Sequence, residues 1–353
     1  MNKEWTGIGL MSGTSLDGID LALCRFAYNG MRWSYSVEKA VTAPYSSGMA
    51  DRLSRAGDMS AIEYALLDVE LGNVFATAIN SWLDKKEGVD FVASHGHTVF
   101  HQPGRGLTTQ IGSGAVIAAK TGLKVVCDFR TKDVALGGQG APLVPIGDEL
   151  LFSEYGACLN LGGFANISFN TGGRRVAFDI SPCNMALNFL AGRRGLRFDR
   201  DGEISSKGIV VEGLLEKLDS LPYYRQTPPK SLGKEWFDEN LLPLMNVFLE
   251  THCVEDVSRT VAEHVAGQIS AAVPEGCATM LATGGGAHNR FLVQLLENKL
   301  PDTSIVVPDA LTVDYKEALV FAFLGLLRIE EKNNTLRSVT GATENSVGGC
   351  VYL

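Results

Sequence analysis

The sequence predicts an α/β fold built from two similar halves. In the first half, apolar runs at 5–11 and 19–26 enclose a glycine-containing turn, and a third predicted strand follows at 32–40. The second half begins with the same pattern about 150 residues later, which indicates a duplicated unit. A chain of 353 residues also fits two domains.

We place the boundary between the domains in the stretch richest in glycine and proline, Gly137–Pro145. Such a stretch suits an interdomain hinge. The predicted domains are therefore 1–145 and 146–353, with the final helix free to pack back across the boundary.

Composition excludes several classes of protein. The formal net charge of −9 argues against a nucleic-acid or anionic-membrane surface. The most apolar segment, 318–327, is far shorter than the roughly 20 residues that span a bilayer. Seven cysteines lack zinc-binding spacing, and the N-terminus lacks a secretory signal pattern. We expect a cytoplasmic protein with no membrane partner.

The first turn combines small residues, hydroxyls and acids. Its glycines let the backbone approach a ligand, and successive N–H groups in such a turn can bind an anion. The two acids would repel a bare phosphate, so they suggest Mg²⁺ between carboxylate and phosphate. The alternative is a hairpin turn whose side chains only satisfy the backbone. The candidate residues are Gly13, Thr14, Ser15, Asp17, Gly18 and Asp20.

A helical region at 51–83 follows, with apolar Ile62, Leu66, Val69 and Val74 at helical spacing. The short strand predicted at 90–94 ends in a polar loop, Ser94–Thr98, where α/β folds place their sites.

The histidines of this loop, His95 and His97, lie close to His101 in the sequence. Three histidines could bind zinc, but no acid or cysteine nearby completes the set. Substrate hydrogen bonding or loop packing is the simpler interpretation.

Arg130 follows a predicted strand at 123–127 that is preceded by a short helix at 115–121. A guanidinium at a strand end suits a carboxylate or phosphate, because it binds both oxygens at once. The alternative is an ion pair with Asp128 or Asp133.

In the second half, predicted strands at 157–161 and 167–169 enclose the turn 162–166. A further strand at 175–178 ends at Asp179, which either faces a cleft or caps the next helix. We expect that helix to begin at Ser181–Asn184, with Pro182 in its first turn.

Helices are then predicted at 209–218 and 258–271. A strand at 278–282, the glycine turn 283–289 and a helix at 290–299 form a unit that suits a nucleotide, because its N–H groups are free. This turn is neither a Gly-x-Gly-x-x-Gly nor a Walker A motif. A strand at 305–307 and a buried helix at 315–330 complete the pattern.

Together these stretches resemble the anhydro-N-acetylmuramic acid kinase family of the actin/hexokinase/Hsp70-type ATPase superfamily. The resemblance runs from the first hairpin nearly to the C-terminus. The motifs that carry it are Gly9-Leu-Met-Ser-Gly-Thr-Ser-Leu-Asp-Gly-Ile-Asp20, Ser94-His-Gly-His-Thr98, Asp128-Phe-Arg130, Asp133-Val-Ala-Leu-Gly-Gly-Gln-Gly-Ala-Pro-Leu-Val-Pro145, Asn160-Leu-Gly-Gly-Phe-Ala-Asn166, Phe178-Asp179, Pro228-Pro-Lys-Ser-Leu-Gly233, Gly284-Gly-Gly-Ala-His-Asn289 and Val339-Thr-Gly-Ala342.

The resemblance implies duplicated actin-like, ribonuclease H-like domains with mixed sheets flanked by helices, and an ATP cleft between them that closes on ligand. It implies ATP and Mg²⁺ as cofactors and Asp179 as the catalytic base. The implied phosphate- and nucleotide-binding residues are those of the first turn together with Asn160, Gly162, Gly163, Asn166, Gly284, Gly285, Gly286 and Asn289. The implied sugar-binding residues are His95, His97, Thr98 and Arg130, and Asp17 and Asp20 would hold Mg²⁺ through the phosphates.

The reaction implied for the family opens the 1,6-anhydro bridge of anhydro-N-acetylmuramic acid with water and phosphorylates O6. Its product is N-acetylmuramic acid 6-phosphate, and it belongs to cell-wall recycling. Homologues of this type are often dimers, so a homodimer is expected.

Three positions depart from the family pattern. His97 replaces glutamine, Ser113 replaces an acid, and 180–183 lacks the glycine that usually follows the catalytic acid. All three belong to the sugar half of the implied site. Two alternatives are therefore a kinase for a related amino sugar, in which Asp179 deprotonates a ready-made hydroxyl, and a sensor that binds ATP and sugar without turnover.

Overall fold

The computed structural model describes residues 3–13, 16–83 and 85–353, which group into two compact units. The first contains Met1–Leu151 and Tyr315–Leu353, and the second contains Phe152–Asp314. The chain thus passes between units twice, and the first unit is discontinuous in sequence. The segment 137–145 lies inside the first unit, and the bounds 1–145 and 146–353 stay a prediction.

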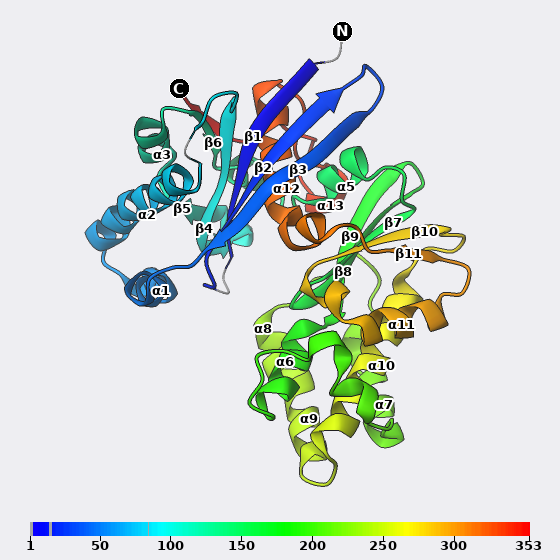
Figure 1. Ribbon diagram of the computed structural model, residues 1–353. Helices are drawn as coiled ribbons and strands as arrows, with labels where there is room; N and C mark the ends of the chain where they lie inside the picture. The colour runs from blue at the N-terminus through cyan, green and yellow to red at the C-terminus, as the bar shows by residue number, and fades with distance from the viewer. Residues whose placement is uncertain (1–2, 14–15, 84) are drawn as a thin grey trace. The chain divides into compact units, whose positions relative to one another are not determined.

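The first unit contains a seven-stranded mixed sheet within the described residues, in the order β12-β6-β4-β1-β2-β3, with β5 beside β4 (Figure 1). The strands β1, β2 and β3 form an antiparallel meander, and β4 pairs with β1 in parallel. The strands are β1 (Lys3–Ser12), β2 (Ile19–Tyr28), β3 (Trp33–Ala43), β4 (Phe91–Gln102), β5 (Leu107–Ile111), β6 (Lys124–Cys127) and β12 (Cys350–Tyr352).

Helices pack on this sheet because side chains alternate between its two faces. Ile8 and Leu10 of β1 belong to a core shared with α2 and α3, whereas Gly9, between them, faces α12. The helices are α1 (Ser47–Ser54), α2 (Ala61–Trp82), α3 (Gly114–Thr121), α4 (Thr131–Ala135), α5 (Pro145–Leu151), α12 (Ala310–Ile329) and α13 (Arg337–Thr340), with 3₁₀ turns η1 (Ala56–Asp58) and η2 (Pro103–Arg105).

Helix α12 approaches β1 so closely that only glycine fits between them. A Cβ built at Gly9 would lie 1.8 Å from the carbonyl oxygen of Ala318. Farther along α12, Phe323 is fully buried and lies 5.5 Å from the ring of Phe26 and 5.1 Å from that of Trp33. The predicted buried helix at 315–330 is confirmed. A preceding helical turn from Ala310 joins it across a kink at Tyr315, where φ is −117° and ψ is 19°.

The second unit contains a five-stranded mixed sheet within the described residues, in the order β11-β10-β7-β8-β9. Here β7, β8 and β9 form the antiparallel meander, and β10 pairs with β7 in parallel. Its strands are β7 (Ala157–Leu161), β8 (Phe164–Thr171), β9 (Arg174–Pro182), β10 (Thr279–Thr283) and β11 (Ser304–Val306).

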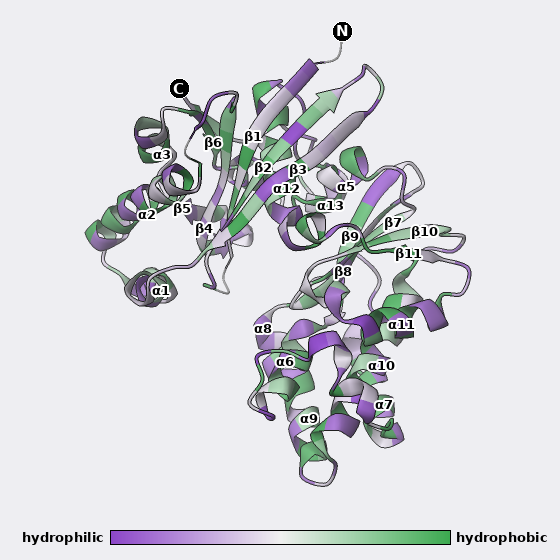
Figure 2. Ribbon diagram, viewed as in Figure 1, coloured by the Kyte–Doolittle hydropathy of each residue, from purple (hydrophilic) through white to green (hydrophobic). Residues whose placement is uncertain are grey.

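The helices of the second unit are amphipathic, and their apolar faces form one core with the sheet. Helix α10, for example, buries Val257, Val261 and Val265 and carries polar residues between them (Figure 2). The elements are α6 (Asn184–Gly192), α7 (Glu212–Asp219), α8 (Lys234–Trp236), α9 (Leu242–Leu249), α10 (Val254–Ala272) and α11 (Arg290–Lys299), a π-helical turn η6 (Phe237–Leu241), and 3₁₀ turns η3 (Arg200–Gly202), η4 (Ser205–Lys207), η5 (Pro222–Arg225) and η7 (Gly285–His288).

The two sheets share one topology, which confirms the predicted α/β fold with duplicated units. In each, an antiparallel meander of three strands is extended by a parallel strand beside its first member. A second parallel strand then follows, β6 in the first sheet and β11 in the second.

Several local predictions were wrong. Residues 94–98 are not a loop, because β4 continues through them. The strand pairs with β1 at Ser94, opposite Leu10, and with β5 at Thr98, opposite Gln110. Residues 181–182 end β9 instead of starting a helix, since β9 stays paired with β8 through Pro182. For the same reason the turn after β7 is short, and Phe164–Asn166 belong to β8.

The helical region at 51–83 is interrupted between α1 and α2. The core face of α2 is formed by Leu67, Leu71, Phe75 and Ile79. The apolar residues Ile62, Leu66 and Val69, which indicated the helix, are instead exposed. No helix in the described part of the chain is long and apolar enough to cross a membrane.

Replacing Phe323 with alanine should destabilise the first unit by about 3–5 kcal/mol, because it leaves a cavity between α12 and the sheet. Met31, 88% exposed, provides the control, and Met31→Ala should change stability by less than about 0.5 kcal/mol. Equilibrium urea unfolding measures both variants. If Phe323→Ala and Met31→Ala had the same free energy of unfolding, packing of α12 against the sheet would not be needed to stabilise the first unit.

Candidate functional site

The turn between β1 and β2 is the first predicted phosphate motif. Thr14 and Ser15 lie outside the described residues. Gly13 accepts a hydrogen bond from the Leu16 N–H at 3.3 Å, and Asp17 is exposed. Asp20 lies on β2, where its carboxylate accepts a hydrogen bond from the Thr42 hydroxyl at 2.6 Å.

Ser12 connects this turn to the histidines of β4. Its hydroxyl lies 2.9 Å from Nδ1 of His97 and 2.6 Å from the hydroxyl of Tyr45. Burial lowers the pKa of His97, so its imidazole is neutral near pH 7. His97 is therefore placed beside the first turn as a neutral hydrogen-bonding group.

His95 holds Arg130. The guanidinium donates from Nε at 3.1 Å and from Nη2 at 2.8 Å to His95 Nε2. Since arginine only donates, Nε2 must be the acceptor, and Nδ1 carries the proton that it donates to Gly96 O at 2.9 Å. Burial, and next the charge of Arg130, lower the pKa of His95 well below its ordinary value. Both ring nitrogens are engaged within the protein, so His95 positions Arg130.

Arg130 is further fixed by the glycine-rich segment that follows it. Its Nη1 donates to Gly140 O at 2.7 Å, and Gly140 N donates to the buried carboxylate of Asp133 at 2.8 Å. Thr340 donates to the second oxygen of Asp133, also at 2.8 Å. Burial lowers the pKa of Arg130 to about 10, which leaves it charged at neutral pH.

The structure thus gives Arg130 partners other than the ion pairs considered from sequence. Asp133 is engaged by Gly140 and Thr340, and Asp128 accepts a hydrogen bond from Thr131. Among the neighbouring charges, that of Glu317 on α12 does most to raise the pKa of Arg130 and so to keep it charged. The sequence did not indicate Glu317. Thr98 lies on β4 opposite Gln110 of β5, and its hydroxyl accepts a hydrogen bond from the Gln110 side chain at 3.4 Å.

In the second unit, the ends of β7 and β10 bring two glycine turns together. A Cβ at Gly284 would lie 2.5 Å from Asn160 Oδ1, and one at Gly286 would lie 2.8 Å from Leu161 Cβ. The Gly284 backbone has φ of 81°, and its N–H donates to Val313 O at 3.1 Å. Glycine is required here by both space and conformation.

The turn after β7 is tied to the start of α6. Gly162 O accepts a hydrogen bond from Asn184 N, and Gly163 O accepts one from Cys183 N. The Asn184 side chain donates to Leu161 O at 2.8 Å. The predicted nucleotide residues Asn160, Gly162, Gly163, Gly284, Gly285 and Gly286 are thus grouped around the ends of β7 and β10.

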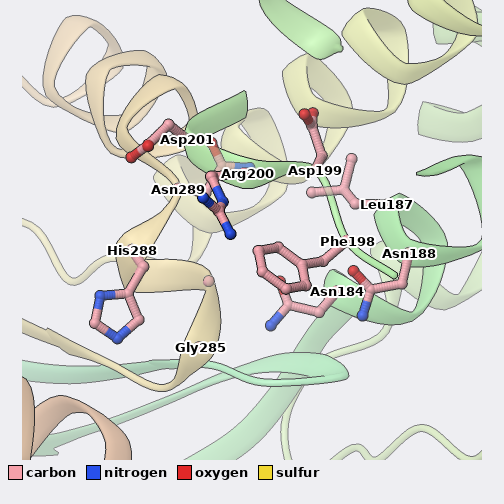
Figure 3. A pocket seen from close by; sticks show the side chains of 11 residues that line it. Asn184, Leu187, Asn188, Phe198, Asp199, Arg200, Asp201, Gly285, His288 and Asn289 are labelled. Atoms are coloured by element: carbon pink, nitrogen blue, oxygen red, sulfur yellow. The ribbon is translucent and has the colours of Figure 1, made fainter. Parts of the chain in front are cut away.

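A pocket of about 470 Å³ opens beside this group (Figure 3). The Phe198 ring and the Arg200 guanidinium point toward its centre in Figure 3. This volume is that of a small-molecule site, and an aromatic face with a few polar groups suits a nucleoside. The lining residues are Asn184, Leu187, Asn188, Phe198, Asp199, Arg200, Asp201, Gly285, Gly286, His288 and Asn289.

Sequence analysis found the glycine side of this pocket and missed the other side. Residues 198–201 carry no motif that marks them as part of a site in the sequence. Asp199 is a buried acid that accepts hydrogen bonds from Ile204 N and Ser205 N and so fixes the loop. Asn289 has a structural task as well, because its side chain caps α11 through Leu292 N at 3.0 Å.

Asp179 lies within β9, paired with Asn166 of β8. Its Oδ2 accepts a hydrogen bond from Leu232 N at 2.9 Å. Burial raises the pKa of Asp179, and the Leu232 hydrogen bond opposes that effect. A half-buried carboxylate with a raised pKa is a stronger base than an exposed one.

Among the residues that the structure describes, no group of three or more histidine, cysteine or acidic side chains could hold a metal ion by itself. The structure groups the sugar-site candidates in the first unit and the nucleotide turns with Asp179 in the second. That both groups face one cleft stays a prediction.

Comparisons with known proteins identify the family of the chain. The family model for anhydro-N-acetylmuramic acid kinase matches residues 6–353. A curated anhydro-N-acetylmuramic acid kinase from Sulfurovum sp. (strain NBC37-1) is 37% identical over 365 residues, covering all of both chains. The chain therefore belongs to the anhydro-N-acetylmuramic acid kinase family.

Solved structures give more distant likenesses. The activator of 2-hydroxyisocaproyl-CoA dehydratase from Clostridium difficile, with bound ADPNP, is 14% identical with a TM-score of 0.42, covering 93% of this chain and 98% of that one. A ROK family protein from Streptococcus pneumoniae TIGR4, in complex with sucrose, is 11% identical with a TM-score of 0.37, covering 92% and 99%.

Gly284→Ala should destabilise the second unit by about 1–3 kcal/mol, because alanine is strained at this φ. It should also weaken ATP binding at least about tenfold, since Asn160 must move. Gly285→Ala is the control for stability, because its Cβ would meet no atom nearer than 3.8 Å. Thermal unfolding and calorimetric titration measure the two effects, and equal unfolding of the variants would contradict the requirement for glycine at 284.

Proposed function

We propose that this protein is an ATP-dependent kinase that opens the 1,6-anhydro ring of anhydro-N-acetylmuramic acid and phosphorylates O6, in cell-wall recycling. The observation that carries the proposal is the family match over 6–353. The full-length relative at 37% identity supports it. Family membership favours this kinase over the related amino-sugar kinase and over the sensor.

Asp179 acts as the general base. Leu232 N–H holds Oδ2, and Oδ1 accepts a proton from the attacking water. The water oxygen forms a bond to C1, the bond from C1 to O6 breaks, and O6 takes the γ-phosphoryl group of ATP. The proton passes to Asp179, and ADP leaves. General-base catalysis of this kind contributes about 10²–10⁴-fold.

The glycine turns position the nucleotide. Backbone N–H groups of Gly13, Gly18, Gly162 and Gly163 would face phosphates. The pocket beside 284–289 would take the nucleoside, with Phe198 available for stacking. Asp17 and Asp20 suit Mg²⁺, which is commonly bound by one or two carboxylates together with phosphate oxygens and water. When bound, Mg²⁺ neutralises charge on the phosphates.

The first unit binds the sugar. Arg130, oriented by His95 and Gly140, keeps N–H groups for an oxygen of the substrate. His97 and Thr98 add neutral hydrogen-bonding groups, and His97 supplies a ring where the family usually has an amide.

We also propose that the enzyme works in the cytoplasm, where ATP is available. We propose further that it forms a homodimer. The exposed apolar residues Ile62, Leu66 and Val69 of α2 are candidates for the dimer interface.

The test is an ADP-release assay with anhydro-N-acetylmuramic acid, ATP and Mg²⁺, with the product's mass recorded. ADP together with a product heavier by one phosphate and one water establishes the hydrolytic kinase. ADP with a product heavier by phosphate alone would indicate the related amino-sugar kinase. Nucleotide binding without ADP release would indicate either a kinase for a different sugar or the sensor.

Asp179→Asn should lower kcat by about 10²–10⁴-fold and leave ATP binding within about twofold of wild type. In the wild type, kcat should fall with decreasing pH through a value above the ordinary aspartate pKa, because the base must be deprotonated.

Because the pKa of Asp179 is raised in the folded state, ionisation of this carboxyl lowers the free energy of unfolding of the protein as pH rises through the folded pKa. The variant should therefore be no less stable than wild type at neutral pH, and equilibrium unfolding of both proteins checks that its loss of activity is not a folding defect. Wild-type turnover by Asp179→Asn would refute the base assignment.

Arg130→Ala should raise KM for the sugar at least about tenfold and change the Kd for ATP by less than about twofold, because the nucleotide turns of the second unit do not involve it. Arg105→Ala removes an exposed arginine of the same unit and serves as the control. Steady-state kinetics and calorimetry give the two constants. Equal losses for both ligands would place Arg130 outside the sugar site.

A further inference from the structure

The segment Pro228-Pro-Lys-Ser-Leu-Gly233 connects η5 to α8 and was singled out by sequence without a role. It runs along Asp179. Pro228, Pro229 and Ser231 are exposed, whereas Lys230 and Leu232 are partly buried. The segment therefore turns two of its side chains toward the unit and presents the others to solvent.

Two backbone contacts join this segment to Asp179. The Asp179 N–H donates to Lys230 O at 3.3 Å, and the Leu232 N–H donates to Asp179 Oδ2 at 2.9 Å. The second contact sets the direction of the carboxylate and leaves Oδ1 as its reactive oxygen. Because a backbone N–H makes it, its geometry depends on where the segment lies.

Lys230 anchors the segment. Its ammonium lies 4.6 Å from the centre of the Tyr223 ring and 5.9 Å from that of Phe178, and it donates to Tyr223 O at 3.4 Å. A cation over aromatic faces is attracted by their electrons. Tyr223 is buried, and its hydroxyl donates to the backbone oxygen of Asp179 at 2.6 Å. The contacts form a closed circuit: Asp179 to Tyr223, Tyr223 to Lys230, and the Lys230 segment back to Asp179.

We propose that 228–233 is a positioning segment for the general base and that Lys230 is the positioning residue that holds it against Asp179. This inference rests on the proposed function, in which Asp179 takes the proton from water. Lys230 acts through Leu232 and Tyr223 and is not itself a catalytic residue.

The positioning has a measurable electrostatic consequence. Burial raises the pKa of Asp179, and the Leu232 N–H lowers it. If the segment moves away from Asp179, the Leu232 hydrogen bond is lost and the pKa of Asp179 rises further. Asp179 would then be deprotonated, and able to act as a base, only at higher pH. In the second unit, the Tyr223 hydroxyl on η5 donates to the backbone oxygen of Asp179, and Asn166 of β8 lies opposite Asp179 in the sheet. The Lys230 ammonium lies over the Tyr223 ring, so Lys230 acts on the carboxylate through the segment and Tyr223.

The experiment compares kcat and KM against pH for wild type, Lys230→Met, Lys230→Arg and Lys234→Met. Methionine keeps the apolar stem and removes the cation, whereas arginine keeps a cation that can lie over the rings. Lys234 is exposed, pairs with Asp238 and lies four residues farther on, so Lys234→Met is the matched control.

In Lys230→Met we expect the acid limb of kcat to move to higher pH. On the acid side, kcat should fall by about three- to tenfold, with less than about a twofold change on the plateau and in KM for ATP. Lys230→Arg should restore the wild-type profile. An unchanged profile for Lys230→Met, or a loss of kcat that is equal at every pH, would overturn the positioning role.

A separate measurement keeps this inference distinct from the proposed function. If the wild type releases no ADP with the anhydro sugar, the proposed function fails. Carbon-13 NMR titration of the Asp179 carboxyl, assigned with Asp179→Asn, then tests the positioning without turnover. A carboxyl that titrates at higher pH in Lys230→Met than in wild type supports it, and identical titration overturns it.

Discussion

The close contact between α12 and β1 is the constraint on which the first unit depends. Alternation along β1 gives one face to Ile8 and Leu10 and the other to Gly9, where no Cβ fits beneath Ala318. Since α12 is apolar on nearly all sides, it is stable only when covered. Its Phe321 also lies 4.6 Å from the ring of His95, so the helix that completes the core supports the histidine that orients Arg130.

Elements whose pattern is local could be predicted from the sequence. Both meanders follow from apolar runs separated by glycine turns, and the buried helix follows from its composition. Residues 94–98 could not be assigned correctly, because their polar side chains resemble a loop while their backbone pairs first with β1 and then with β5. The core face of α2 was equally hidden, since apolar residues occur on both of its faces and only packing against the sheet selects Leu67, Leu71 and Phe75.

The residues of the candidate site also divide into those that the sequence indicates and those that only the folded structure brings together. The glycine turns and Asp179 carry signals within a few residues and were found. Phe198 and Arg200 were not, because they acquire a role only when their loop is folded against the turn at 285–289. Lys230 is a similar case: its sequence neighbours are prolines and a serine, and its aromatic partners lie on other elements. Residues that work by orienting others leave little trace in a single sequence.

The discontinuity of the first unit has a consequence for biosynthesis. Chains emerge from the ribosome N-terminus first, and domains usually fold as they are completed. The segment 1–151 is made first, yet α12 and β12 belong to the last part of the chain. The second unit, which is continuous, has its whole sequence available earlier. The second unit can therefore be completed before the first, and the face of the first sheet that α12 covers stays uncovered until α12 has been translated.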